Sequence, residues 1–244
     1  MEQAICVRKL RKEYGAKVAV NDISFEVEKG TLFSLLGVNG AGKTTTIKML
    51  TGLARPTDGD ALVMGKNICG EIEEVKKLVN VSTQETAIAP KLTVRENLEF
   101  IAGVYGMDKT ATGKKVQEMI DKFGLQEVEN AKTKTLSGGW QRKLSIAMAL
   151  ITEPEVIFLD EPTLGLDVLA RRELWSVIEE IKKSVTIVLT THYMEEAEAL
   201  SDKIAIMVDG EIKMIGTLEE IKSATGKDNL EDAFVTCVNL AKKD

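Results

Sequence analysis

The sequence predicts an α/β protein in which a block of helices interrupts a core of strands and helices. Three observations support this fold class. Residues 31–36 form an apolar run that leads into a glycine-rich loop and then into a helical pattern. Residues 93–150 carry apolar side chains at helical spacing, and no segment among them resembles a strand. From Val156 onward, short apolar strands again alternate with helices.

The length and composition limit the class of protein. The chain has 244 residues, of which 44% are hydrophobic and 29% are charged, as in ordinary globular proteins. With 32 basic and 38 acidic residues, its formal net charge is −6. We therefore expect no nucleic-acid partner, because such binding usually requires a basic face. The three cysteines are widely spaced and form no C-x-x-C pair, so we predict neither a disulfide framework nor a zinc site.

The sequence also bears on the location of the protein. Its longest apolar runs, such as residues 156–159, have the length of a strand and not of a membrane span. The basic residues near the N-terminus are not followed by the apolar region of a signal peptide. We therefore expect the protein to stay in the cytoplasm.

The strands and helices of the core are predicted from apolar alternation and from turn residues. Ile23, Phe25 and Val27 alternate with polar residues, as in a half-buried strand. The helix that follows Gly42 should end near Gly52. Further strands are expected at residues 156–159, 185–189, 203–208 and 211–215, and further helices at residues 168–183, 194–200 and after Thr217.

The helical block between the two parts of the core should contain three helices. Thr93 and Glu96 form a capping box at the start of the first. The second is expected at residues 113–123, and the third follows Ser137. No element is predicted beyond Lys227.

Residues 37–44 fit the phosphate-loop pattern G-x-x-x-x-G-K-[ST]. The glycines let phosphate oxygens approach the backbone, and the amide groups and the helix N-terminus point toward the anion. Lys43 can reach the β- and γ-phosphates, and Thr44 can offer its hydroxyl to Mg²⁺. A chance match is on the order of one per cent for a chain of this length. The loop therefore predicts the binding of ATP with Mg²⁺.

Two acidic residues follow the buried strand at residues 156–159. Asp160, at the carboxyl end of this strand, would hold Mg²⁺, and Glu161 could polarise the attacking water. Taken alone, the pair is better interpreted as a strand end that runs out into solvent. The phosphate loop elsewhere in the chain favours the functional interpretation.

A Ser-Gly-Gly triplet at residues 137–139 opens the third helix of the block. Its amide groups and the Ser137 hydroxyl can form a second anion site, although serine is also common as a simple helix cap. One chain with two phosphate-binding helix ends is unusual. One explanation is that the second end serves the nucleotide of another subunit.

On these motifs, the chain resembles the nucleotide-binding subunit of an ATP-binding cassette (ABC) transporter over about residues 4–221. The matching motifs follow the order of the family, with Walker A at residues 37–44, the Q-loop at Gln84, the signature at 136–141, the end of Walker B at 158–162, the D-loop at 165–167 and the switch histidine at His192. Walker A alone would indicate only a P-loop NTPase. The signature is the specific part of the match.

The resemblance implies a P-loop NTPase (ABC ATPase) core with a mixed sheet, an N-terminal antiparallel β part and an inserted α-helical subdomain. The whole chain, residues 1–244, would then be a single domain. Its parts would be a catalytic α/β core at residues 1–84 and 152–226, a helical subdomain with the signature at 85–151, and a C-terminal tail at 227–244.

The resemblance also assigns roles to individual residues. The catalytic set would be Lys43, Gln84, Glu161 and His192, of which His192 contacts the γ-phosphate and positions water. Mg²⁺ would be held by Thr44, Gln84 and Asp160. The nucleotide would be contacted by Tyr14, which stacks on adenine, by Gly37, Asn39, Gly40, Ala41, Gly42, Lys43, Thr44 and Thr45, and across a dimer by Ser137, Gly138, Gly139 and Asp167. Trp140 departs from the usual signature, but no catalytic position is degenerate, so we expect an active ATPase.

Two partners follow from the resemblance. One is a second copy of the chain or a homologous ATPase, arranged head to tail so that each ATP lies between one P-loop and the partner's signature. The other is a separate membrane permease, which would dock near Gln84, Glu85 and residues 90–94. The protein would then be peripheral on the cytoplasmic face of the membrane. The run at residues 194–200, together with Gly216 and Thr217, resembles the drug-, lipid- or ion-export branch of the family.

One alternative function is left open by the sequence. It is a soluble ABC ATPase of a non-transport assembly, such as iron–sulphur cluster biogenesis. An unrelated P-loop kinase or GTPase is disfavoured, because the signature is present and no guanine-reading N-K-x-D motif is evident.

Overall fold

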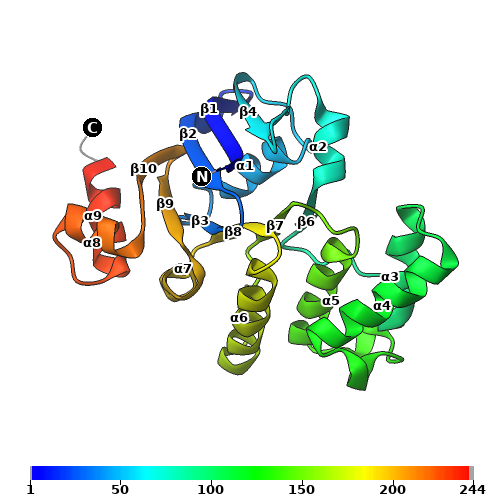
Figure 1. The fold of residues 1–244 in the computed structure, drawn as a ribbon. Helices are drawn as coiled ribbons and strands as arrows, with labels where there is room; N and C mark the ends of the chain where they lie inside the picture. The colour runs from blue at the N-terminus through cyan, green and yellow to red at the C-terminus, as the bar shows by residue number, and fades with distance from the viewer. Residues whose placement is uncertain (1, 242–244) are drawn as a thin grey trace.

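The computed structural model describes residues 2–241, and its strands form two sheets with helices packed around them (Figure 1). The larger sheet has six strands in the order β10-β9-β3-β8-β7-β6. Their bounds are β3 (Leu32–Leu36), β6 (Val79–Ser82), β7 (Val156–Asp160), β8 (Thr186–Thr191), β9 (Lys203–Val208) and β10 (Glu211–Gly216). The smaller sheet has four strands in the order β2-β1-β4-β5.

The six-stranded sheet is mixed, as predicted. Its strands pair in parallel from β9 through β3, β8 and β7 to β6, and only β10 is antiparallel to its neighbour. Every residue of β3, β7 and β8 is buried. Continuous apolar strands of this kind are typical of parallel sheets that are covered on both faces. Because these strands are parallel, their carboxyl ends meet at one edge of the sheet.

The four-stranded sheet is the antiparallel part that was expected near the N-terminus. It contains β1 (Gln3–Tyr14), β2 (Lys17–Glu28), β4 (Asp58–Val63) and β5 (Lys66–Asn67). Its apolar side chains share one core cluster with helix α1 (Lys43–Leu50) and with the near face of the larger sheet. The stacked rings of Phe25 and Phe33, whose centroids lie 5.1 Å apart, join the two sheets.

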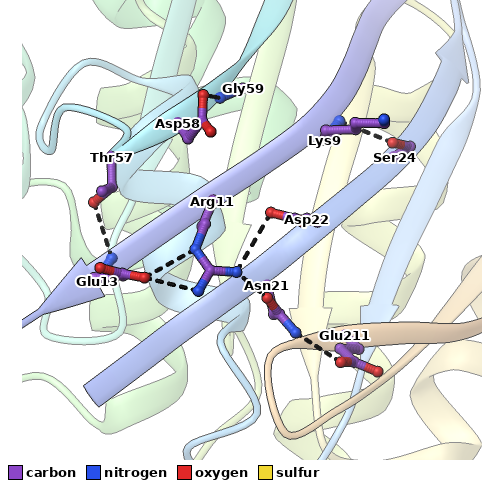
Figure 2. A network of polar contacts seen from close by, with 10 residues as sticks. All are labelled: Lys9, Arg11, Glu13, Asn21, Asp22, Ser24, Thr57, Asp58, Gly59 and Glu211. Carbon is purple, nitrogen blue, oxygen red and sulfur yellow. Dashed lines mark hydrogen bonds and ion pairs between the residues drawn. The ribbon is translucent and has the colours of Figure 1, made fainter. Parts of the chain in front are cut away.

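A polar network connects the small sheet with β10 (Figure 2). The Arg11 guanidinium donates to the Glu13 carboxylate from Nη2 at 2.7 Å and from Nε at 2.9 Å, and also donates to the Asn21 side chain. The Asn21 amide in turn donates to the Glu211 carboxylate at 2.7 Å. These contacts fix β1 and β2 against the hairpin of β9 and β10.

The helical block contains α3 (Val94–Val104), α4 (Lys109–Phe123) and α5 (Gly138–Leu150), which pack together with α6 (Val168–Lys182) in a second core cluster (Figure 1). The capping box of Thr93 and Glu96 is formed. Helix α4 begins four residues before the predicted start at Gly113, because Asp108 caps it and accepts from the backbone N–H groups of Thr110 and Ala111. Gly113 lies within the helix and does not begin it.

The C-terminal part consists of α7 (Met194–Leu200), α8 (Leu218–Thr225) and α9 (Leu230–Ala241). The sequence predicted no element after Lys227, so α9 is an addition. Its buried residues Leu230, Ala233, Phe234 and Cys237 pack against β9 and recur at helical spacing. The periodic signal was therefore present in the sequence. Residues 242–244 of the predicted tail lie outside the described part.

Several other elements were not predicted, namely β1, β4, β5, α2 (Ile72–Leu78) and β6. In β1 the apolar alternation is hidden by basic residues and by shifts of register between Val7 and Lys12. Lys9 and Gly59 mark such an irregularity, since both have positive φ angles, of 46° and 75°. In residues 2–241, none of the helices is long and apolar enough to cross a membrane.

Removal of the Phe234 ring should show that α9 is part of the folded core. This ring is 5% exposed, so Phe234→Ala should lower the free energy of unfolding by about 3 kcal/mol. Urea denaturation followed by circular dichroism measures this change. The adjacent Val235 is 49% exposed, and Val235→Ala should change the free energy by less than about 0.5 kcal/mol. Equal effects of the two substitutions would contradict the packing of α9 described here.

Candidate functional site

The loop at residues 37–44, the acidic pair and His192 meet at one edge of the six-stranded sheet. The loop follows β3, Asp160 and Glu161 lie at the end of β7, and His192 follows β8. Because β3, β8 and β7 are adjacent and parallel, their carboxyl ends bring these side chains together. The crevice at this edge is where open α/β sheets commonly bind ligands.

The glycine loop is shaped by close contacts with its surroundings. A Cβ atom on Gly37 would lie 2.4 Å from the carbonyl oxygen of Met207, and one on Gly42 would lie 2.6 Å from that of Ala19. Gly42 also has a φ angle of 107°, which side chains rarely allow. The backbone N–H of Gly210 donates to the Ala41 carbonyl at 3.0 Å. Both sheets therefore hold the loop in place.

Lys43 begins α1 and lies across this loop. Its buried ammonium group donates to the carbonyl oxygens of Gly37 at 2.6 Å and Val38 at 3.3 Å. The same group forms an ion pair with Glu161 Oε1 at 3.0 Å. The charge of Lys43 is thus directed toward the backbone of the loop and toward the acidic pair.

Glu161 is shared between Lys43 and His192. Its Oε2 lies 2.7 Å from His192 Nδ1, while its Oε1 contacts the Lys43 ammonium. Its side chain is almost fully buried, and its backbone has a positive φ angle of 49°. The backbone N–H donates to the Thr190 carbonyl and hydroxyl oxygens, both at 3.1 Å, which supports this uncommon conformation. The strained turn points the carboxylate into the site.

Asp160 has a different environment. Its Oδ1 accepts from the hydroxyl of Thr44 at 3.0 Å and from the hydroxyl of Thr190 at 2.6 Å. Residues 2–241 contain no cluster of three or more histidine, cysteine or acidic side chains suited to a metal. Mg²⁺ is commonly held by one or two carboxylates together with phosphate oxygens. The oxygen donors of Thr44 and Asp160 fit this pattern.

A cavity of about 380 Å³ lies beside the loop. It is lined by most of the predicted nucleotide contacts and by some additional residues, namely Tyr14, Lys17, Ala19, Asn39, Gly40, Ala41, Gly42, Lys43, Thr44, Thr45, Gln84, Glu161 and Leu164. The Tyr14 ring is half exposed, and the Lys12 ammonium lies 4.9 Å from its centre. Sequence reasoning missed Lys17 and Ala19, which carry no motif of their own.

The backbone at Gln84 is held by a residue that the sequence did not indicate. Arg142 of α5 donates to the carbonyl oxygens of Thr83 at 2.8 Å and Gln84 at 2.7 Å. Burial lowers the pKa of the Arg142 guanidinium. This contact ties the helix that follows the signature to the end of β6. It joins residues far apart in sequence, so no local pattern could have predicted it.

The signature and Asp167 lie outside the cavity beside Lys43. Ser137 caps α5 by accepting from the Trp140 N–H at 3.5 Å, and Asp167 caps α6 by accepting from the N–H groups of Leu169 and Ala170. Gly138 lines a separate cavity of about 390 Å³ near Gly165 and Leu166. The structure therefore brings Lys43, Glu161 and His192 together, but it does not add Ser137, Gly138, Gly139 or Asp167 to them.

Trp140 of the signature helix α5 is linked to the neighbouring helix α6 through Lys143. The Lys143 ammonium lies 4.8 Å from the centre of the Trp140 ring and forms an ion pair with Glu173 of α6 at 3.0 Å. The ring is partly buried against the core cluster of the helical block. The helical block therefore has room for a tryptophan side chain at position 140.

Comparison with known proteins supports one family. Residues 20–164 match the family model described as ABC transporter. The probable multidrug ABC transporter ATP-binding protein YbhF of Escherichia coli (strain K12) is 37% identical over 98% of this chain. The chain spans only 42% of the length of YbhF.

A second relative and a solved structure agree. The doxorubicin resistance ATP-binding protein DrrA of Mycobacterium tuberculosis is 38% identical over 100% of this chain and 73% of its own length. A solved structure described as the ATP binding subunit of an ABC transporter superposes with a TM-score of 0.84. It is 30% identical and covers 96% of this chain and 99% of its own. On its motifs, its fold and these relatives, the chain belongs to the ABC transporter family.

Proposed function

We propose that this chain is the ATP-binding and ATP-hydrolysing subunit of an exporter whose permease is a separate protein. The observation that carries the proposal is the connection from the buried Lys43 through the buried Glu161 to His192, beside a cavity lined by the glycine loop. The names of YbhF and DrrA, which mention multidrug transport and doxorubicin resistance, support export. The alternative of a non-transport assembly has no such support.

ATP would bind with its phosphates on the glycine loop and its base near Tyr14. The amide groups of the loop and the N-terminus of α1 supply donors, and Lys43 supplies a positive charge. Phosphate oxygens would replace the Gly37 carbonyl and the Glu161 carboxylate as partners of Lys43. Thr45 lines the same cavity and would add a further contact.

Thr44, Asp160 and Gln84 would hold Mg²⁺. Thr44 and Asp160 already lie within hydrogen-bond distance, and Gln84 lines the same cavity as Thr44. When bound, the ion would neutralise charge on the phosphate oxygens. The Arg142 contact with the carbonyl oxygen of Gln84 keeps this residue near the cavity.

Glu161 and His192 would act on the attacking water. The water oxygen bonds to the γ-phosphorus while the bond to the leaving ADP oxygen breaks, and the water proton passes to the Glu161 carboxylate. His192 would contact the γ-phosphate and position this water. The 2.7 Å contact between Glu161 Oε2 and His192 Nδ1 holds the two side chains close together.

A second copy of the chain would complete each site. Ser137, Gly138, Gly139 and Asp167 lie outside the cavity of their own chain, although Ser137 opens a helix whose N-terminus favours anions. In a head-to-tail dimer these residues would meet the nucleotide of the partner. Such a dimer has two equivalent sites.

The permease would dock beside the Q-loop, at the cytoplasmic face of the membrane. A small cavity of about 160 Å³ lies there between β6 and helices α3 and α5, and Tyr105 and Thr83 line it. Phe100, Val104 and Tyr105 expose more than half of their surface at the end of α3. This apolar patch supports a protein contact.

Glu161→Gln tests the role assigned to the carboxylate. The amide cannot accept the water proton, so the turnover number for ATP should fall by at least about 100-fold. ATP should still bind, and a dimer should accumulate with ATP and Mg²⁺ in size-exclusion chromatography. Glu179→Gln, at an exposed position of α6, serves as the control. Near-normal hydrolysis by Glu161→Gln would remove this residue from the mechanism.

Tyr14→Ala tests the site proposed for the base. Loss of an aromatic stacking partner should raise the KM for ATP roughly 10-fold, with little change in the turnover number. Tyr14→Phe keeps the ring and should behave as the wild type. Steady-state kinetics over a range of ATP concentrations measure both parameters. An unchanged KM in Tyr14→Ala would place the base elsewhere.

The proposed coupling to a permease is tested in native membranes. Affinity purification of the chain after mild detergent extraction should recover a protein with several membrane spans, identified by mass spectrometry. Removal of the apolar patch by Phe100→Ser with Val104→Ser should reduce this recovery without loss of ATP binding. A set of partners that contains only water-soluble proteins would support the alternative assembly function.

A further inference from the structure

Glu196 is a buried acidic residue that the proposed mechanism does not use. In residues 2–241, the buried side-chain polar atoms without a hydrogen-bond partner are Thr163 Oγ1, Arg171 Nε and Glu196 Oε2. They belong to three segments around His192, namely the loop after β7, helix α6 and helix α7. Such atoms are uncommon in folded proteins and call for an explanation.

The contacts of Glu196 join these segments. The side chain is fully buried on α7, and its Oε1 accepts from Trp175 Nε1 of α6 at 3.2 Å. The hydroxyl groups of Thr163 and Thr191 lie next to the same carboxyl group. One side chain thus contacts α6, the loop that leads to Asp167 and the end of β8.

The residues on either side of His192 depend on this arrangement. The backbone N–H of Tyr193 donates to Thr191 Oγ1 at 3.0 Å, so the Thr191 hydroxyl proton is free to face Glu196. The rings of His192 and Tyr193 lie 4.1 Å apart, and the Arg171 guanidinium lies 4.4 Å from the centre of the Tyr193 ring. Helices α6 and α7 therefore hold both neighbours of His192.

The charged groups around Glu196 have other partners. Arg171 of α6 lies 3.8 Å from Glu195, and Arg142 of α5 donates to backbone carbonyl groups. Glu161 lies beyond β8 and is paired with Lys43. Its negative charge disfavours a negative charge on Glu196. Burial, to which the Glu161 charge adds, raises the pKa of Glu196 more than the neighbouring Thr191, Thr163 and Trp175 groups lower it.

We propose that Glu196 is a positioning residue, whose buried carboxyl group joins α6 and the Thr163 loop to the segment that carries His192. The raised pKa favours the neutral form of this group, which can both donate and accept hydrogen bonds. Displacement of Asp167 by a partner subunit would reach His192 through this joint, since Asp167 caps α6. The inference rests on the proposed role of His192 in hydrolysis.

Activity measurements test the joint. Glu196→Ala should lower the turnover number for ATP by about 10- to 100-fold, since a misplaced group slows chemistry more than binding. The KM for ATP should stay within about twofold of the wild type. Glu196→Gln keeps the shape and the hydrogen bonds of a neutral carboxyl group, so it should restore most of the turnover. An unchanged turnover in Glu196→Ala, or failure of Glu196→Gln to restore it, would overturn the proposal.

Thermal unfolding tests the neutral carboxyl group without any turnover. An unfolded glutamate has a pKa of about 4.3. Because the folded pKa is raised, the wild type loses stability as the pH rises from this value toward the folded pKa. When melting temperatures are measured from pH 5 to pH 8, the excess of Glu196→Gln over the wild type should therefore grow with pH until the folded pKa is passed. Glu179→Gln makes the same substitution at an exposed glutamate and should show no such trend.

The two measurements separate the two proposals. A constant difference in melting temperature between Glu196→Gln and the wild type across this pH range would show that the carboxyl group is already ionised. It would overturn the proposal that a neutral Glu196 joins these segments. If the wild-type dimer hydrolysed no ATP, the proposed function would fail, while the thermal series would still report on Glu196.

Discussion

The carboxylate of Glu161 touches both Lys43 and His192, and the rest of the site depends on this shared contact. It exists because β3, β8 and β7 are adjacent and parallel, so that three distant segments end at one edge. The left-handed turn at Glu161 completes it by directing the side chain inward. A strained backbone of this kind persists only where its surroundings fix it, and hydrogen bonds to Thr190 do so here.

The antiparallel sheet has a direct part in shaping the site. The carbonyl oxygen of Ala19 on β2 lies where a side chain at position 42 would have to go, and the β9–β10 turn donates to the loop through Gly210. The Arg11 and Asn21 network ties β1 and β2 to that turn (Figure 2). The strand that carries Tyr14 is therefore connected to the phosphate loop through these contacts.

Local patterns predicted the parts of this protein that are themselves local. The strand, loop and helix around residues 31–50 could be predicted because each has its own period or turn chemistry. Strand β1 was missed because basic residues and bulges hide its alternation, and α9 because its apolar period is short and is carried only by Leu230, Ala233, Phe234 and Cys237. The bonds from Arg142 to the Gln84 backbone and from Trp175 to Glu196 join distant residues. Such contacts depend on tertiary packing, and no short stretch of the sequence reveals them.

The signature helix α5 and helix α6 pack closely against each other where both begin. A Cβ atom at Gly139 would lie 3.2 Å from the Ala170 side chain, so the start of α5 packs closely on the start of α6. Ser137 and Asp167 cap these two helices, and α6 also carries Arg171 and Trp175. We therefore expect a partner subunit that contacts either cap to act on both helices, because dense packing resists compression and the starts of α5 and α6 cannot shift independently.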